Sequence, residues 1–150
     1  MPDLPRKKIG LIACSGEELA EGTVTRRAVR KVLETLRPDD TVTLCLPLFL
    51  AGGEGERAFA RHYPTIAVDG CDKRCAAQAT EKYSAKPAAS IVVTEIAKES
   101  GCGAIGTARR LNENGQRLAE TIAEKIVEET DRLLKKKPRD AGRAAGREER

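Results

Sequence analysis

Residues 64–75 read Pro-Thr-Ile-Ala-Val-Asp-Gly-Cys-Asp-Lys-Arg-Cys, so a short apolar run leads directly into a polar segment with two thiols. The run from Pro64 to Asp69 predicts a buried strand, and the residues from Cys71 to Tyr83 predict a helix directly after it. Cys71 and Cys75 would then lie one turn apart on the same helix face. The positive end of the helix dipole at this N-terminus would stabilise thiolates.

The same order of strand and helix recurs along the rest of the chain. Further strands are predicted at Ile9–Cys14, Thr41–Leu46 and Ala89–Ile96, and further helices at Val24–Leu36, Glu54–His62 and Gln116–Leu134. Ser15 and Glu18 match an S-x-x-E capping box that would start the first helix. The alternation predicts an α/β fold with three layers, in which an open, mostly parallel four-stranded sheet has helices on both faces, as in Rossmann-like and flavodoxin-like folds.

The composition predicts one domain followed by a basic tail. The 150 residues include no Trp, two Tyr and two Phe, so aliphatic side chains must fill the core. The segment 135–150 holds seven of the 27 basic residues and three of the 23 acidic ones, which leaves residues 1–134 without net charge. We expect a single domain over residues 1–134 and a disordered tail over residues 135–150. Because no aromatic residue is interleaved with the tail's cations, we do not expect a nucleic-acid partner.

The cysteines indicate a reducing compartment. There are five of them, an odd number, with no recognisable disulfide framework. The apolar stretch Ile9–Ala13 is shorter than the roughly 7–15 residues of a signal-peptide core, and no apolar run approaches the roughly 20 residues of a membrane span. We therefore expect a cytoplasmic protein that does not associate with a membrane. The sequence leaves its oligomeric state open.

Three of the predicted strands have a cysteine at or near their carboxyl end. Cys14, Cys45 and Cys71 are spaced by close to one βαβ unit of roughly 30 residues. If the first strand lies between the second and the third, these strand ends are neighbours about 4.8 Å apart, at the edge where α/β proteins bind ligands. Together with Cys75 they would supply the four ligands of a tetrahedral zinc site. The spacing alone fits small, buried thiols without a metal equally well.

At these residues the sequence resembles a known family. Asp69-Gly70-Cys71 followed by Cys75, together with Cys14-Ser15-Gly16 and a cysteine after the second predicted strand, resembles the DGC domain, which is named for its Asp-Gly-Cys motif. The resemblance covers roughly Ile9 to Ile96. It implies a bacterial zinc-binding domain with four chelating cysteines, which would here be Cys14, Cys45, Cys71 and Cys75. It implies no particular biological role.

Three functions remain open on the sequence. The first is a zinc-binding module whose metal is structural, or serves metal handling or a protein partner. The second is a small enzyme that uses a zinc-bound thiolate or a metal-activated water, with Glu95 and Asp69 as candidate bases. The third is an iron–sulfur or redox protein, because four cysteines also suit such a cluster.

Three further residues have alternative interpretations. Asp69 either caps the following helix or orients a group behind the metal. Cys102 lies in Gly101–Gly106, which matches G-x-G-x-x-G but does not directly follow a strand, so we favour a loop thiol over a spare ligand or a dinucleotide site. His62 is expected to be a surface histidine rather than a metal ligand.

Overall fold

A computed structural model describes residues 7–136 of the chain. In chain order its elements are β1 (Ile9–Ala13), α1 (Ala20–Lys31), the π-helical turn η1 (Val32–Leu36), β2 (Thr41–Thr43), α2 (Leu46–Ala51), α3 (Glu54–Arg57), α4 (Phe59–His62), β3 (Thr65–Asp69), α5 (Cys75–Tyr83), β4 (Ala89–Val92), α6 (Val93–Glu99) and α7 (Glu113–Leu134). The expected disordered tail lies outside the described residues except for Lys135 and Lys136. That tail and the domain boundary at residue 134 therefore stay predictions.

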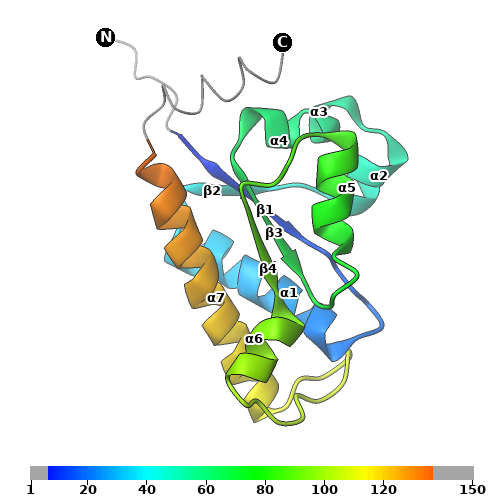
Figure 1. Cartoon of the computed structure of the whole chain (residues 1–150), viewed down its shortest axis with the longest axis vertical. Helices are drawn as coiled ribbons and strands as arrows, with labels where there is room; N and C mark the ends of the chain where they lie inside the picture. Colours follow the sequence, from blue (N-terminus) through cyan, green and yellow to red (C-terminus); the bar gives the residue numbers. More distant parts are fainter. Residues whose placement is uncertain (1–6, 137–150) are drawn as a thin grey trace.

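The four strands form one parallel sheet in the order β2-β1-β3-β4 (Figure 1). Leu11 of β1 lies opposite Thr43 of β2 on one side and Ile66 of β3 on the other. This arrangement confirms the α/β prediction. It also places β1 between the other two strands that precede a cysteine, so that all three strand ends point to the same edge of the sheet.

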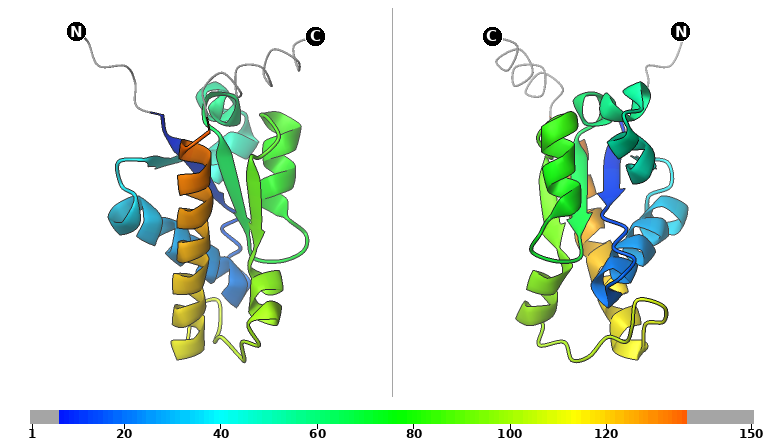
Figure 2. Two further views of the ribbon diagram at one scale, coloured as in Figure 1. Left: turned by 60° about the vertical axis from the view of Figure 1, so that its left-hand side comes forward. Right: turned by 90° about the vertical axis from the view of Figure 1, so that its right-hand side faces the viewer.

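Helices cover both faces of the sheet (Figure 2). On one face Leu11 and Val68 pack with α1 and α7 in a large aliphatic cluster that includes Ile122. On the other face Ile12 packs with α2 and α5 in a smaller cluster that includes Phe49. Successive side chains of a strand point to opposite faces, which explains why neighbours such as Leu11 and Ile12 enter different clusters.

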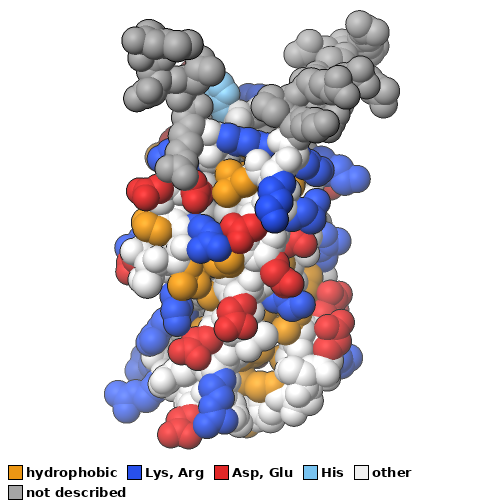
Figure 3. All heavy atoms as spheres, turned by 90° about the vertical axis from the view of Figure 1, so that its left-hand side faces the viewer, with side chains coloured by type: hydrophobic (Ala, Val, Ile, Leu, Met, Phe, Trp, Pro, Cys, Tyr) orange, Lys and Arg blue, Asp and Glu red, His pale blue; other side chains and the backbone are white. Residues whose placement is uncertain are grey.

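Charged side chains of both signs are interspersed on the face of the molecule seen in Figure 3, and hydrophobic atoms show only between them. This view agrees with the absence of net charge outside the basic tail.

Two strands end earlier than the sequence predicts. The strand predicted over Thr41–Leu46 stops at Thr43, and Leu46 begins α2, because Pro47 suits the first turn of a helix, where its missing N–H has no partner to lose. The strand predicted over Ala89–Ile96 stops at Val92, which lies opposite Asp69, the last residue of β3. Beyond Val92 there is no strand left to pair with, and the chain forms α6, a helix that the pattern did not predict.

The predicted capping box is wrong. Helix α1 begins at Ala20, its N-cap is Leu19, and no side chain caps it. Ser15 has a φ of 64°, in the left-handed region, so the chain makes a turn there instead of starting a helix. From Ala20 the helical backbone continues through η1 to Leu36, where the apolar periodicity predicts its end.

Two other helices differ from their predicted limits. The helix predicted over Glu54–His62 is divided at Ala58 into α3 and α4. The last helix begins at Glu113 instead of Gln116, because the Asn112 side chain caps it by accepting a hydrogen bond of 2.9 Å from the Gly115 N–H.

Candidate metal centre at the carboxyl edge of the sheet

Cys14 connects the end of β1 to the Asp-Gly-Cys segment. Its backbone N–H donates to the Val68 carbonyl at 3.0 Å, and its sulfur accepts a hydrogen bond from the Gly70 N–H at 3.3 Å. The sulfur also lies 3.8 Å from the Thr25 hydroxyl, which itself donates to the Gly22 carbonyl at 2.6 Å. A backbone N–H aimed at sulfur is the kind of contact that orients and stabilises a ligating thiolate.

The two thiols of the Asp-Gly-Cys segment do not share a helix, which corrects the sequence prediction. Helix α5 begins at Cys75, and residues 70–74 form a turn before it. Within that turn the Arg74 N–H donates to the Cys71 carbonyl at 3.2 Å, and Arg74 has a φ of 51°. Cys71 is half-buried beside Gly70, whereas Cys75 is exposed in the first turn of α5.

Cys45 lies at the start of α2. It occupies the N-cap position, and its carbonyl accepts the Phe49 N–H at 3.0 Å. Its side chain is exposed, like that of Cys75. Since β2 already ends at Thr43, Cys45 follows its strand at a greater remove than Cys14 follows β1.

The structure thus brings some of the predicted ligands together and leaves others apart. Cys14 and the Asp-Gly-Cys segment are in contact through the Gly70 N–H, and Cys45 and Cys75 start the helices that follow β2 and β3. Among residues 7–136, no three His, Cys, Asp or Glu side chains are grouped closely enough to hold a metal ion. The four-thiol site therefore stays a prediction.

Three glycines let the two cysteine-bearing loops approach α1. A Cβ atom on Gly22 would lie 1.9 Å from the Gly16 carbonyl oxygen, and one on Gly70 would lie 2.9 Å from the Gly22 nitrogen. Both distances are shorter than a real side chain tolerates, so only glycine permits this packing. The loop after β1 and the loop after β3 are pressed against the same turn of α1, which keeps Cys14 close to Cys71.

Arg26 holds the first of these loops from the other side. Its guanidinium donates to the Ser15 carbonyl at 2.7 Å and to the Thr23 hydroxyl at 3.0 Å, and it forms an ion pair with Glu17 at 3.1 Å. The sequence pattern does not indicate this role, because an arginine on an amphipathic helix usually belongs to its solvated face.

Asp69 is the cap of α5. Its carboxylate accepts hydrogen bonds from the N–H groups of Ala76 at 2.7 Å and Ala77 at 3.2 Å, which confirms the capping interpretation. Burial raises the pKa of this carboxyl above its ordinary value, and the two hydrogen bonds together with Arg74 act in the opposite direction. The side chain is 1 % exposed, so solvent does not reach the carboxylate that fixes the start of α5.

The cysteines, the Asp-Gly-Cys turn and the α/β scaffold all fall within one family match. The family model of the DGC domain matches residues 10–126. The chain belongs to the DGC domain family. The match spans most of the chain and includes Cys14, Cys45, Cys71 and Cys75. No curated protein and no solved structure matches the chain.

Two further candidates of this DGC domain, Cys102 and His62, lie outside the segments that carry the four predicted ligands. Cys102 follows α6, packs against the large aliphatic cluster and donates its N–H to the Ala97 carbonyl at 3.0 Å. Its glycine-rich segment forms a loop between two helices, so it lacks the strand-to-helix setting of a dinucleotide site. His62 ends α4 and is exposed. No helix in the described part of the chain has the length and hydropathy of a membrane span.

Proposed function

We propose that this DGC domain binds one Zn²⁺ ion through the thiolates of Cys14, Cys45, Cys71 and Cys75. The observation that supports this most directly is the 3.3 Å hydrogen bond from the Gly70 N–H to the Cys14 sulfur. It joins the thiol after β1 to the backbone that carries Cys71, although the two residues are far apart in the sequence. Thiolate is the commonest ligand of structural zinc, and four of them complete a tetrahedral site.

Metal binding on this proposal draws in the two exposed thiols. Cys14 and Cys71 are held by the sheet and by the glycine contacts with α1, whereas Cys45 and Cys75 begin helices on the smaller core. In the described residues the four thiols are not yet grouped as metal ligands. Zinc binding would therefore be coupled to a local rearrangement at the starts of α2 and α5. The parts that would adjust are the first turn of α5, which the Asp69 side chain caps, and the N-cap residue of α2, Cys45.

The bound ion would cross-link the three loops that carry the cysteines. Its biological use would be metal handling or the presentation of a surface to a protein partner. The proposal includes a reducing compartment such as the cytoplasm, since all five cysteines are free thiols. Neither an enzymatic use of the bound thiolate nor an iron–sulfur cluster has a specific observation in its favour here.

The test is elemental analysis of anaerobically purified protein. We expect about one zinc per chain, and a loss or sharp fall of the zinc content when Cys14, Cys45, Cys71 or Cys75 is replaced by Ser. Cys102→Ser is the matched control, because it removes a thiol from the α6–α7 loop and should leave the zinc content unchanged. Iron in place of zinc would favour the cluster. Absence of any metal from a folded protein would overturn the proposal.

A further inference from the structure

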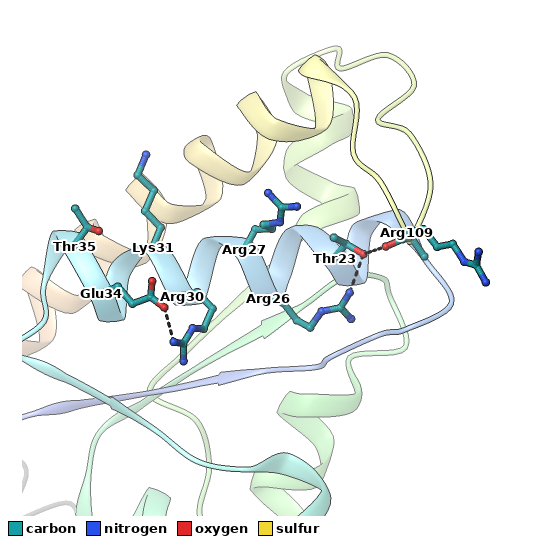
Figure 4. Close-up of a pocket in the computed structure, with 9 residues that line it drawn as sticks. Thr23, Arg26, Arg27, Arg30, Lys31, Glu34, Thr35 and Arg109 are labelled. Atoms are coloured by element: carbon teal, nitrogen blue, oxygen red, sulfur yellow. Dashed lines mark hydrogen bonds and ion pairs between the residues drawn. The ribbon is translucent and has the colours of Figure 1, made fainter.

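Five cations line one groove along the exposed side of α1, which we call the cationic groove (Figure 4). Its volume is about 720 Å³. The charged residues that line it are Arg26, Arg27, Arg30, Lys31, Glu34 and Arg109. A single carboxylate among six charged side chains is unusual for a chain that carries no net charge over residues 1–134. The local excess of positive charge points to an anionic partner.

Two of these cations have no partner among residues 7–136. Within that part of the chain the ion pairs of the groove are Arg26–Glu17 at 3.1 Å, Arg30–Glu34, and Lys31–Glu120 at 3.7 Å. Among the described residues, the side chains of Arg27 and Arg109 form neither an ion pair nor a hydrogen bond. Both are exposed. They are therefore the two charges that a bound anion could neutralise without breaking an existing contact.

The directions of the side chains favour an extended ligand over a small one. Arg26 and Arg30 extend to one side of α1, Arg27 and Lys31 extend to the other, and Arg109 points away from the helix (Figure 4). A small anion such as phosphate needs donors that converge on one point. Cations distributed along both flanks instead suit a chain that lies along the helix. The 12 residues of α1 span about 18 Å, the length of five or six extended residues.

The carboxylates at its borders favour a polypeptide over a nucleic acid. Glu17, Glu34 and Glu120 each already pair with a cation of the groove. A phosphate backbone carries charge at every nucleotide and would be repelled where it passes them, whereas an acidic polypeptide can place uncharged residues there. No aromatic residue lines the groove to stack on a base. We propose that the cationic groove binds an acidic segment of a partner protein, with Arg27 and Arg109 as the principal contacts.

The cationic groove adjoins the candidate metal centre. Arg26 lines the groove and also donates to the carbonyl of Ser15, the residue after Cys14. A partner segment in the groove would thus lie beside the loop of the first thiol. The proposal itself does not depend on metal binding, because it is based on charges outside the thiol site.

A binding titration with a labelled ten-residue peptide in which glutamate alternates with serine tests the proposal on the full-length chain. We expect binding at low salt that weakens at least about tenfold when the ionic strength rises from about 0.05 to 0.5 M, because exposed charges are screened. Arg27→Glu combined with Arg109→Glu should weaken it at least about tenfold at low salt. Arg61→Glu, which reverses an exposed charge on α4, is the matched control and should change it less than about twofold.

Because the segment 135–150 also carries seven cations, the same titration is followed by backbone amide NMR shifts. Shifts along α1 and around Arg109 support the proposal. Shifts confined to residues 135–150, equal loss of affinity in Arg61→Glu and in the double variant, or tighter binding of a 20-base-pair DNA duplex than of the peptide would each overturn it.

Discussion

The two faces of the sheet are built on different scales. Among the described residues, the cluster under α1 and α7 contains 17 buried hydrophobic residues, six of them from the 22-residue helix α7, whereas the cluster under α2 and α5 contains seven. The smaller cluster is the one that Cys14 packs against, and the helices over it begin at or next to Cys45 and Cys75. The larger face therefore provides a fixed platform, and the smaller face carries the thiols that the proposed metal binding would move.

The largest expected effect contrasts the cores of the two faces. Ile122→Ala on α7 removes a side chain that is 0 % exposed and should lower the free energy of unfolding by about 4 kcal/mol. Leu46→Ala on α2, where the side chain is 8 % exposed at the border of the smaller cluster, should cost about 2 kcal/mol. Urea denaturation of both variants measures the difference. Equal costs would contradict the contrast between the faces.

The next effect concerns the contact between α1, which belongs to the larger face, and the loop after β1 that carries Cys14. Gly22→Ala places a Cβ atom against the Gly16 carbonyl and should cost about 2–3 kcal/mol, although alanine favours helices. Gly55→Ala is the control, because a Cβ atom there meets nothing within 4 Å, and it should be neutral or stabilising by about 0.5 kcal/mol. Thermal denaturation compares the two. If Gly22→Ala raised the melting temperature, that result would contradict the close contact between Gly22 and the Gly16 carbonyl.

A smaller effect is expected where the smaller face is capped. Asp69→Ala leaves the N–H groups of Ala76 and Ala77 without their acceptor and should cost about 1–2 kcal/mol. Because the pKa of Asp69 is raised in the folded state, its protonation contributes stability that is fully present below the ordinary pKa of 3.8 and is lost as the pH rises through the raised value. The Asp69→Asn variant cannot titrate at this position. Between pH 3.8 and the raised pKa, the free energy of unfolding of the native chain should therefore fall relative to that of Asp69→Asn. Denaturation curves between pH 3 and 7 give the sign.

The smallest effect belongs to the platform. Arg37, which follows η1, donates to both carboxylate oxygens of Asp131 on α7 at 2.9 Å, and this hydrogen bonding lowers the pKa of Asp131. The stability that the Arg37–Asp131 pair provides is present above the ordinary carboxyl pKa of 3.8. It is lost as the pH falls through the lowered pKa of Asp131. Since the pair is about one-third exposed, solvent screening limits its contribution to about 0.5 kcal/mol. Asp131→Asn should show that loss at pH 7 and a smaller loss near pH 2, and an equal loss at both values would contradict the assignment.

The platform could be predicted from the sequence because its signals are local. The apolar run of β1 and the helical periodicity over the whole length of α7 each predict an element without information from the rest of the chain. The limits of β2 and β4 could not be predicted, because they depend on where partner strands end and on Pro47 starting a helix. The pattern Ala89–Ile96 favours a strand throughout, yet β3 ends opposite Val92.

The candidate site divides in the same way. The common edge of Cys14, Cys45 and Cys71 follows from the alternation of strands and helices, and the central position of β1 agrees with the order that a converging site needs. Asp69 could be predicted as a cap, but the start of α5 at Cys75 could not, because Asp69 bonds to Ala76 across the intervening turn of residues 70–74. The contact of Gly22 with Gly16 likewise depends on packing between segments, which no local pattern encodes.

X-ray absorption spectroscopy at the zinc edge, on protein loaded with one equivalent of zinc, tests the central claim most directly. Coordination by Cys14, Cys45, Cys71 and Cys75 predicts a first shell of four sulfurs at about 2.3 Å. Cys45→Ser should replace one of these sulfurs by oxygen or nitrogen, and Cys102→Ser should leave the spectrum unchanged. A first shell dominated by oxygen or nitrogen in the native chain would contradict the four-thiolate site.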